Sequence, residues 1–222
     1  MSGGGAGFAL QDGGCGGMTG VVQFIKKQWF YGFAGLLLVA VMSGIVYMYA
    51  WGSTRFPVVG QATNFTLTNT AGKPVQLTDS NGKVRLLAFI YTRCTSVCPI
   101  TTYTMEQVQS KLKQKGVFGK DVEFVSVTID PENDTPAVLT KYAQEYHADL
   151  SGWEFLTGPP NQVFNVLKLY QVQTVQQGNG QIGHPAVTAL IDGAGNIRKE
   201  YGVIKPTDAD QIASDILRLM NQ

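Results

Sequence analysis

The chain has 222 residues, of which 44% are hydrophobic, so it can form one ordinary domain with a core of its own. Lysine and arginine number 17 against 16 aspartates and glutamates, which gives a formal net charge of +1. This balance excludes the strongly basic composition of nucleic-acid-binding proteins, and we expect no nucleic-acid partner. The 3 cysteines are too few for a scaffold stapled by disulfides, so each thiol is considered individually.

The beginning of the chain, up to Gly20, is rich in glycine. Glycine loses much backbone entropy on ordering, and this segment has little apolar surface to bury in return, so we expect a flexible tail. Cys15 lies alone in this tail. We expect Cys15 to have no role of its own, and a lipid attachment site is the alternative.

An uncharged apolar stretch of about 22 residues runs from Phe30 to Trp51. As a helix it would rise roughly 33 Å, enough to cross the hydrocarbon core of a membrane. A cleaved signal peptide is the alternative. Its apolar region would span only about 7 to 15 residues, and Met48-Tyr49-Ala50 is a poor cleavage site. We therefore expect one uncleaved transmembrane helix.

The charges that flank this stretch predict its orientation. Lys26 and Lys27 precede it and only Arg55 closely follows, which by the positive-inside tendency places the tail in the cytoplasm. The tail lacks the arginine-rich pattern of an organellar transit peptide, which favours a bacterial plasma membrane. We therefore predict a flexible cytoplasmic tail (1–28), a single-pass anchor (29–52) and a folded periplasmic domain (57–222).

The remainder of the chain alternates between strand and helix patterns. The apolar run at 84–91 predicts a strand buried on both faces of a sheet, and 122–129 (VEFVSVTI) predicts a second core strand. The other predicted elements are a hairpin of 65–68 and 74–77, helix 99–115, a helix capped by Asp134 or Thr135 and ending near Tyr146, strand 153–156, a helix capped by Asn161 and ending at Tyr170, a hairpin of 186–192 and 197–201, and helix 208–220. This order predicts a mixed α/β sheet with helices on both faces.

A close pair of cysteines, Cys94 and Cys98, joins the first buried strand to its helix. The residue before a proline avoids the helical conformation, so we expect Cys98 to lie just ahead of a helix that begins at Pro99. Free N–H groups and the helix dipole at such a place stabilise a thiolate. A thiolate is both the nucleophile of disulfide exchange and a ligand for soft metal ions.

His184 is the candidate third ligand. In a thioredoxin-like topology the loop before strand 186–192 packs beside the cysteine loop, and a neutral imidazole is a common metal ligand. The other histidine, His147, follows a predicted helix and is expected on the surface. Two sulfurs and one nitrogen suit Cu(I), and with a further ligand Cu(II). Zinc would also accept them, so the spacing alone predicts a soft-metal site without naming the metal.

At these residues the sequence resembles the Sco/SenC family of copper-binding assembly factors for cytochrome c oxidase. The likeness extends over roughly residues 57–221. It consists of a single anchor, the sequence Phe89-Ile90-Tyr91-Thr92-Arg93-Cys94 before a CxxxCP loop, the segment Asp130-Pro131-Glu132-Asn133-Asp134-Thr135, and the late histidine.

The resemblance implies a thioredoxin-like fold and copper, Cu(I) or Cu(II), held by Cys94, Cys98 and His184. It also implies delivery of copper to the binuclear copper centre of the oxidase, or maintenance of the thiols there. The copper-bearing oxidase subunit is then the expected partner, with other periplasmic copper chaperones or thiol reductants as further candidates. Asp130 would orient the loop or the ligands, with a simple turn before proline as the alternative. Asp134 is expected only to cap a helix.

Two positions depart from the family pattern. Asn133 stands where the family often has arginine, and Pro185 follows the histidine where the family often has serine. Because thioredoxins carry a cis-proline before the equivalent strand, we expect a cis His184–Pro185 bond.

The sequence favours a metallochaperone. Two enzymatic functions remain as alternatives. The first is a thiol–disulfide oxidoreductase in which Cys94 and Cys98 cycle between dithiol and disulfide. The second is a peroxidase-like enzyme on the same fold. Copper binding requires a reduced pair, so the chaperone and the oxidoreductase can be successive states of one protein.

Overall fold

The computed structural model describes residues 18–48, 55–177 and 180–222, and the chain divides into two compact units, Met1–Thr54 and Arg55–Gln222. The described part of the first unit is one helix, α1 (Met18–Tyr47). Within it, Trp29–Tyr47 has a mean hydropathy of 2.0 and is long and apolar enough to cross a membrane. The predicted N-terminal apolar helix is therefore present.

Helix α1 begins at Met18, inside the segment predicted to be a flexible tail. Residues 18–28 contain no proline, so the helix can extend backwards from the apolar segment without losing a backbone hydrogen bond. The rest of the predicted tail, with Cys15, and the last residues of the predicted anchor (49–52) lie outside the described residues.

The second unit is built on a mixed sheet of eight strands in the order β1-β10-β9-β4-β5-β6-β2-β3. Its strands are β1 (Gly60–Gln61), β2 (Thr66–Asn69), β3 (Pro74–Gln76), β4 (Val84–Ile90), β5 (Val122–Thr128), β6 (Trp153–Thr157), β9 (Thr188–Ile191) and β10 (Asn196–Tyr201). The central strands β4, β5 and β6 run parallel, and β9 pairs antiparallel with β4. Every residue of β4 is buried, as predicted for this strand, and this includes the charged Arg85.

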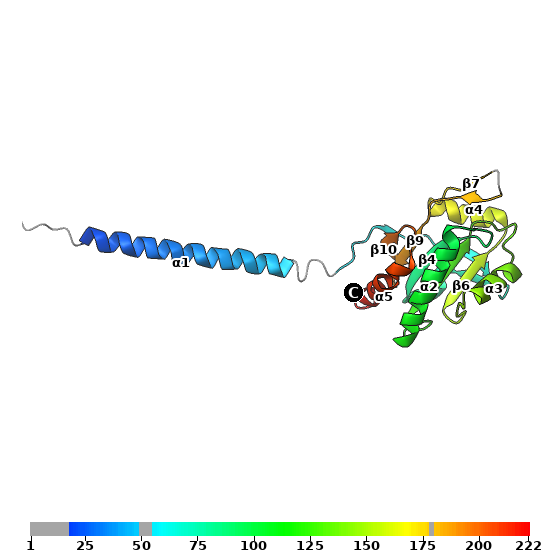
Figure 1. The fold of residues 1–222 in the computed structure, drawn as a ribbon, viewed down its shortest axis with the longest axis horizontal. Helices are drawn as coiled ribbons and strands as arrows, with labels where there is room; N and C mark the ends of the chain where they lie inside the picture. The colour runs from blue at the N-terminus through cyan, green and yellow to red at the C-terminus, as the bar shows by residue number, and fades with distance from the viewer. Residues whose placement is uncertain (1–17, 49–54, 178–179) are drawn as a thin grey trace, which may run out of the picture. The chain divides into compact units, whose positions relative to one another are not determined.

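Helices cover both faces of this sheet (Figure 1). They are α2 (Val97–Gln114), α3 (Pro136–Glu145), α4 (Pro160–Leu169) and α5 (Ala209–Leu219), with short 3-10 turns η2 (Leu77–Ser80) and η3 (Pro206–Asp208). On one face α5 packs beside α2, and Thr102 of α2 shares a 2.9 Å hydrogen bond with Tyr142 of α3. On the other face Tyr170, which ends α4, packs against Phe89 of β4 with ring centroids 5.5 Å apart. The predicted two-faced arrangement is confirmed.

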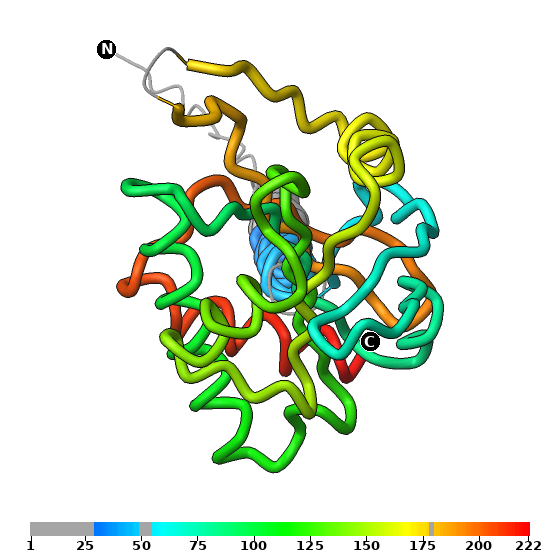
Figure 2. Tube along the Cα trace, turned by 90° about the vertical axis from the view of Figure 1, so that its right-hand side faces the viewer, coloured from blue at the N-terminus to red at the C-terminus, as the bar shows by residue number. Residues whose placement is uncertain are grey.

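Helix α4 and one hairpin differ from the sequence-based prediction. Pro159, and not Asn161, occupies the N-cap of α4, because a proline with extended ψ followed by Pro160 suits a helix start. Two short strands, β7 (Val175–Gln176) and β8 (Ile182–Gly183), form a hairpin that was not predicted, since two-residue strands carry no readable periodicity. This hairpin lies at the outer edge of the domain, beyond α4 (Figures 1 and 2).

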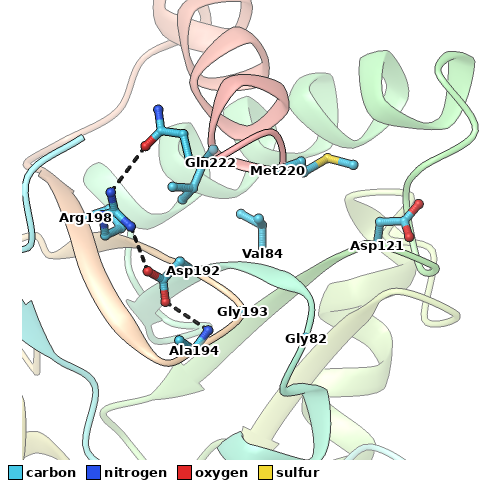
Figure 3. A pocket seen from close by; sticks show the side chains of 10 residues that line it. Gly82, Val84, Asp121, Asp192, Gly193, Ala194, Arg198, Met220 and Gln222 are labelled. Carbon is cyan, nitrogen blue, oxygen red and sulfur yellow. Dashed lines mark hydrogen bonds and ion pairs between the residues drawn. The ribbon is translucent and has the colours of Figure 1, made fainter. Parts of the chain in front are cut away.

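Arg198 of β10 joins the two ends of the domain, and Figure 3 shows its contact with Gln222 at the C-terminal end. Its guanidinium donates to the carbonyl of Phe56, to Oε1 of Gln222 at 3.2 Å and to Oδ2 of Asp192 at 2.9 Å. A cavity of about 420 Å³ lies beside this joint, and its lining includes neither cysteine nor histidine. These contacts hold the two ends of the domain together.

Candidate functional site

The cysteine loop begins at the end of β4 and enters the first turn of α2. Cys94 and Cys98 are both buried, and both are free thiols. Helix α2 begins at Val97, so the expectation that Cys98 precedes the helix is wrong. Pro99 is the third helical residue, where an N–H has no intrahelical partner, so the ring costs no helical hydrogen bond and α2 can begin before it.

The two thiols have unequal proton affinities. Burial raises the pKa of Cys94, but the backbone N–H groups of Cys98, Ser96 and Val97, together with the Cys98 thiol, outweigh it and lower that pKa from 9.0 to about 7. Burial raises the pKa of Cys98 well above its usual range, and the neighbouring Cys94 adds to the rise. Cys94 is therefore the thiol that ionises near neutral pH.

His184 follows β8 and is half-buried. Its ring meets the ring of Tyr91 edge-on, with centroids 6.0 Å apart, and Nδ1 lies 2.9 Å from the carbonyl oxygen of Pro185. Burial lowers the pKa of His184, against a smaller opposing effect of that carbonyl, which favours the neutral imidazole. Since a carbonyl only accepts, Nδ1 carries the proton in this contact and Nε2 keeps its lone pair for a metal ion.

Cys94 and His184 line the same cavity, which has a volume of about 380 Å³. The fold thus brings the late histidine to the cysteine loop, as the topology predicts. Within the described part of the chain, however, no three histidine, cysteine, aspartate or glutamate side chains are grouped closely enough to hold one metal ion. Assembly of a three-ligand site therefore needs a local rearrangement, and the ligand set Cys94, Cys98 and His184 stays a prediction.

The His184–Pro185 peptide bond is trans, as are all described peptide bonds, so the expected cis bond is wrong. The trans form is the intrinsically preferred one even before proline. In this arrangement the imidazole of His184 contacts the Pro185 carbonyl.

Asp130 forms an ion pair with Arg93, the residue directly before Cys94. Its Oδ2 accepts hydrogen bonds from Nε and a terminal nitrogen of Arg93, at 3.0 and 2.8 Å, and its Oδ1 accepts one from Asn133 at 2.8 Å. The carboxylate is buried while the guanidinium is half-exposed. These contacts fit the predicted role in orienting the loop. Asn133, one of the two departures from the family pattern, bonds the same carboxylate.

Asp134 also serves the cysteine loop, and the expectation that it only caps a helix is wrong. Thr135 caps α3, because its hydroxyl accepts from the Val138 N–H at 3.4 Å. Asp134 is completely buried and accepts from the N–H and hydroxyl of Thr92 and from the hydroxyl of Thr128. It therefore ties the end of β4 to the end of β5. Its position between a buried strand and the next helix was the available signal.

Tyr91 and Gln181 are further site residues that sequence reasoning missed. The Tyr91 hydroxyl donates to Oε1 of Gln181 at 3.0 Å and accepts from the Ile182 N–H at 3.2 Å. Nothing in the sequence pairs these residues, which lie far apart along the chain. His147, by contrast, is exposed just after α3, as predicted.

Comparison with known proteins decides the family. The sequence model of the SCO1/SenC family matches residues 59–221, nearly the whole second unit. The chain belongs to the SCO1/SenC family. The SCO1 protein homolog of Bacillus subtilis (strain 168) is 32% identical over 181 residues, which cover 78% of this chain and 92% of the relative. The family resemblance noted in the sequence is confirmed.

Solved Sco structures share the fold. BsSco, a member of the Sco family of cytochrome c oxidase assembly proteins with a disulfide switch, is 33% identical with a TM-score of 0.64, covering 75% of this chain and 97% of its own. ScoI of Bradyrhizobium japonicum with copper bound is 27% identical with a TM-score of 0.61, covering 72% of this chain and 99% of its own. The predicted thioredoxin-like α/β fold is confirmed.

Proposed function

We propose that this SCO1/SenC protein is a copper chaperone that holds copper between Cys94, Cys98 and His184. The acceptor is the binuclear copper centre of cytochrome c oxidase, to which it delivers copper or whose thiols it maintains. One observation carries the proposal: a thiol that ionises near neutral pH and a neutral imidazole line the same cavity. The copper-bound ScoI structure of the same family supports copper as the metal.

The arrangement of the proposed ligands suits a metal ion that is bound for a time and then transferred to another protein. Cu(I) prefers soft thiolate ligands and is also bound by imidazole. The two cysteines lie on one strand-to-helix junction, whereas His184 belongs to a separate segment after β8. His184 can therefore join or leave the copper without moving the sulfurs. An acceptor thiolate or imidazole can replace one ligand at a time through the cavity.

Copper binding by the reduced full-length protein in detergent tests the sulfur ligands. We expect stoichiometric Cu(I) in the native protein and its loss in Cys94→Ser and in Cys98→Ser, because each removes a thiolate. Cys15→Ser is the matched control, and it should keep full copper. Full occupancy in Cys94→Ser would place the copper elsewhere.

A matched pair of histidine variants tests the nitrogen ligand. His184→Asn should weaken Cu(I) affinity by at least about tenfold, measured by competition with a chromophoric chelator, because an amide is a poor ligand for a soft ion. His147→Asn should leave the affinity unchanged. His147 has φ 52, a conformation that asparagine tolerates, so this control should not strain the backbone. Equal affinity of both variants would remove His184 from the ligand set.

The unequal thiols favour thiol–disulfide exchange as a second function. The Cys94 thiolate would attack a substrate disulfide, forming a mixed disulfide and releasing one substrate thiol. Cys98 would then attack the Cys94 sulfur, giving the Cys94–Cys98 disulfide and a fully reduced substrate, with two electrons transferred. His184→Asn separates the two functions. Metal transfer should fail in that variant, while reduction of a model disulfide should largely survive.

We also propose that α1 anchors the protein in a bacterial plasma membrane. The apolar part Trp29–Tyr47 supports this, and Lys26 and Lys27 ahead of it favour a cytoplasmic N-terminus. The tail (1–28) would then be cytoplasmic, the span (29–52) would be the anchor, and the copper-binding domain (57–222) would face the periplasm. This placement puts the thiols in the compartment where disulfides persist and where periplasmic copper chaperones and thiol reductants are available as partners.

A further inference from the structure

Tyr91 is placed to connect the two halves of the proposed site. It directly follows β4, a strand buried over its whole length, and its own side chain is buried. Its hydroxyl makes the two hydrogen bonds already described, to Gln181 Oε1 at 3.0 Å and from the Ile182 N–H at 3.2 Å. Both partners belong to the segment that leads into His184. The hydroxyl of Tyr91, at the end of the central strand β4, therefore holds this segment in place.

A second contact completes the connection on the cysteine side. Nε2 of Gln181 donates to the carbonyl of Arg93 at 3.2 Å, and Arg93 directly precedes Cys94. The Tyr91 and His184 rings also meet in an edge-to-face arrangement. Tyr91 and Gln181, which we call the latch, both line the shared cavity and connect the histidine segment to the cysteine loop.

The β7–β8 hairpin itself contributes little to the position of His184. Each of its strands has two residues, and both residues of β7 are exposed. Ile182 of β8 is buried, but a two-stranded ribbon this short is marginal on its own and depends on its contacts with the rest of the domain. The hydrogen bonds of the latch therefore do much to fix the position of the chain just ahead of His184.

We propose that Tyr91 is a positioning residue, whose hydroxyl holds the His184 segment beside the cysteine loop and so strengthens copper binding through His184. The inference rests on the proposed function and adds a residue to it. Holding a ligand near its binding geometry lowers the conformational entropy lost on binding, which appears as tighter affinity. Tyr91 needs no contact with copper for this effect.

Tyr91→Phe tests the hydroxyl alone, because the ring that packs against His184 is kept. We expect Cu(I) affinity of the full-length protein to fall by about tenfold, as for the loss of one to two net hydrogen bonds. Gln181→Leu should give a loss of the same order, because it removes both of the side-chain latch bonds. Tyr103→Phe, on the exposed side of α2, is the matched control and should not change the affinity.

A double-mutant cycle decides whether Tyr91 acts through His184. In a His184→Asn background, Tyr91→Phe should cause no further loss of Cu(I) affinity. The same loss in both backgrounds would overturn the inference and indicate either a general structural effect or an effect of the hydroxyl on the neighbouring Cys94 side chain. No loss from Tyr91→Phe in the native background would also overturn it. If His184→Asn alone left the affinity unchanged, the proposed ligand set would fail as well, so the two failures are distinguishable.

Discussion

The backbone N–H of Cys98 donates to the sulfur of Cys94 across 3.4 Å. Ser96 occupies the N-cap of α2 but makes no side-chain capping bond, so the Cys94 sulfur accepts an N–H that a capping oxygen would otherwise take. The helix start and the thiolate therefore stabilise each other. Copper or a disulfide partner that engages this sulfur also acts on the first turn of α2.

The first prediction concerns the pH dependence of thiol reactivity. With a pKa of about 7, Cys94 gains thiolate as pH rises through neutrality. Its rate of alkylation by iodoacetamide should therefore be half-maximal near pH 7 in the reduced, copper-free Cys15→Ser protein, followed by peptide mass spectrometry. Cys98, whose pKa is raised by burial, should stay unmodified over the same range. An inflection for Cys94 close to pH 9 would contradict the stabilisation described here.

The second prediction concerns the ion pair beside the cysteine loop. Asp130→Asn removes the charge that holds Arg93, so the loop should sample more conformations and Cu(I) affinity should fall by about tenfold. Asp149→Asn is the matched control, since Asp149 pairs with Lys113 near the other end of α2. Chelator competition on both variants measures the effect. Equal affinities would assign Asp130 to a simple turn.

The third prediction concerns the buried carboxylate of Asp134. Asp134→Ala leaves the N–H and hydroxyl of Thr92 and the hydroxyl of Thr128 without their acceptor. The free energy of unfolding should fall by about 3 kcal/mol, measured by urea denaturation. Asp210→Ala, at an exposed surface pair with Lys111, should change it by no more than about 1 kcal/mol. A loss as small as in this control would show that Asp134 is not structurally required.

The raised pKa of Asp134 also leads us to expect that the free energy of unfolding depends on pH. Burial raises its pKa in the folded protein, against the opposing effect of its hydrogen bonds. A carboxyl with a raised folded pKa stabilises the fold most when protonated. Its contribution is therefore full below the ordinary pKa of aspartate and is lost as pH rises through the higher folded value. Denaturation curves across this acidic range should show that component in the native protein and lack it in Asp134→Asn.

The fourth prediction concerns membrane orientation. In a Cys94→Ser, Cys98→Ser background, a membrane-impermeant thiol reagent applied to intact spheroplasts should label Lys120→Cys, an exposed position ahead of β5. It should not label Cys15, because the positive-inside tendency keeps the tail in the cytoplasm. Permeabilised cells provide the control in which both sites react. Labelling of Cys15 alone in intact spheroplasts would reverse the proposed topology.

By itself, the sequence determined the features that depend on local pattern. The mostly apolar stretch of β4 and the strand-forming residues of β5 predict buried strands of a sheet, because such stretches are stable only when they are covered on both faces. The apolar helix follows from length and lack of charge. The CxxxCP loop with its acidic segment and late histidine was enough to indicate the family, because several motifs in fixed order rarely coincide.

Only the tertiary structure decided which side chains serve the cysteine loop. Asp134 looks like a helix cap in sequence, and only the neighbouring ends of β4 and β5 turn it into a buried acceptor for Thr92 and Thr128. Tyr91 and Gln181 meet because the sheet places β4 beside a segment that comes much later in the chain. Such contacts are set by packing between distant segments, and local propensity carries no record of them.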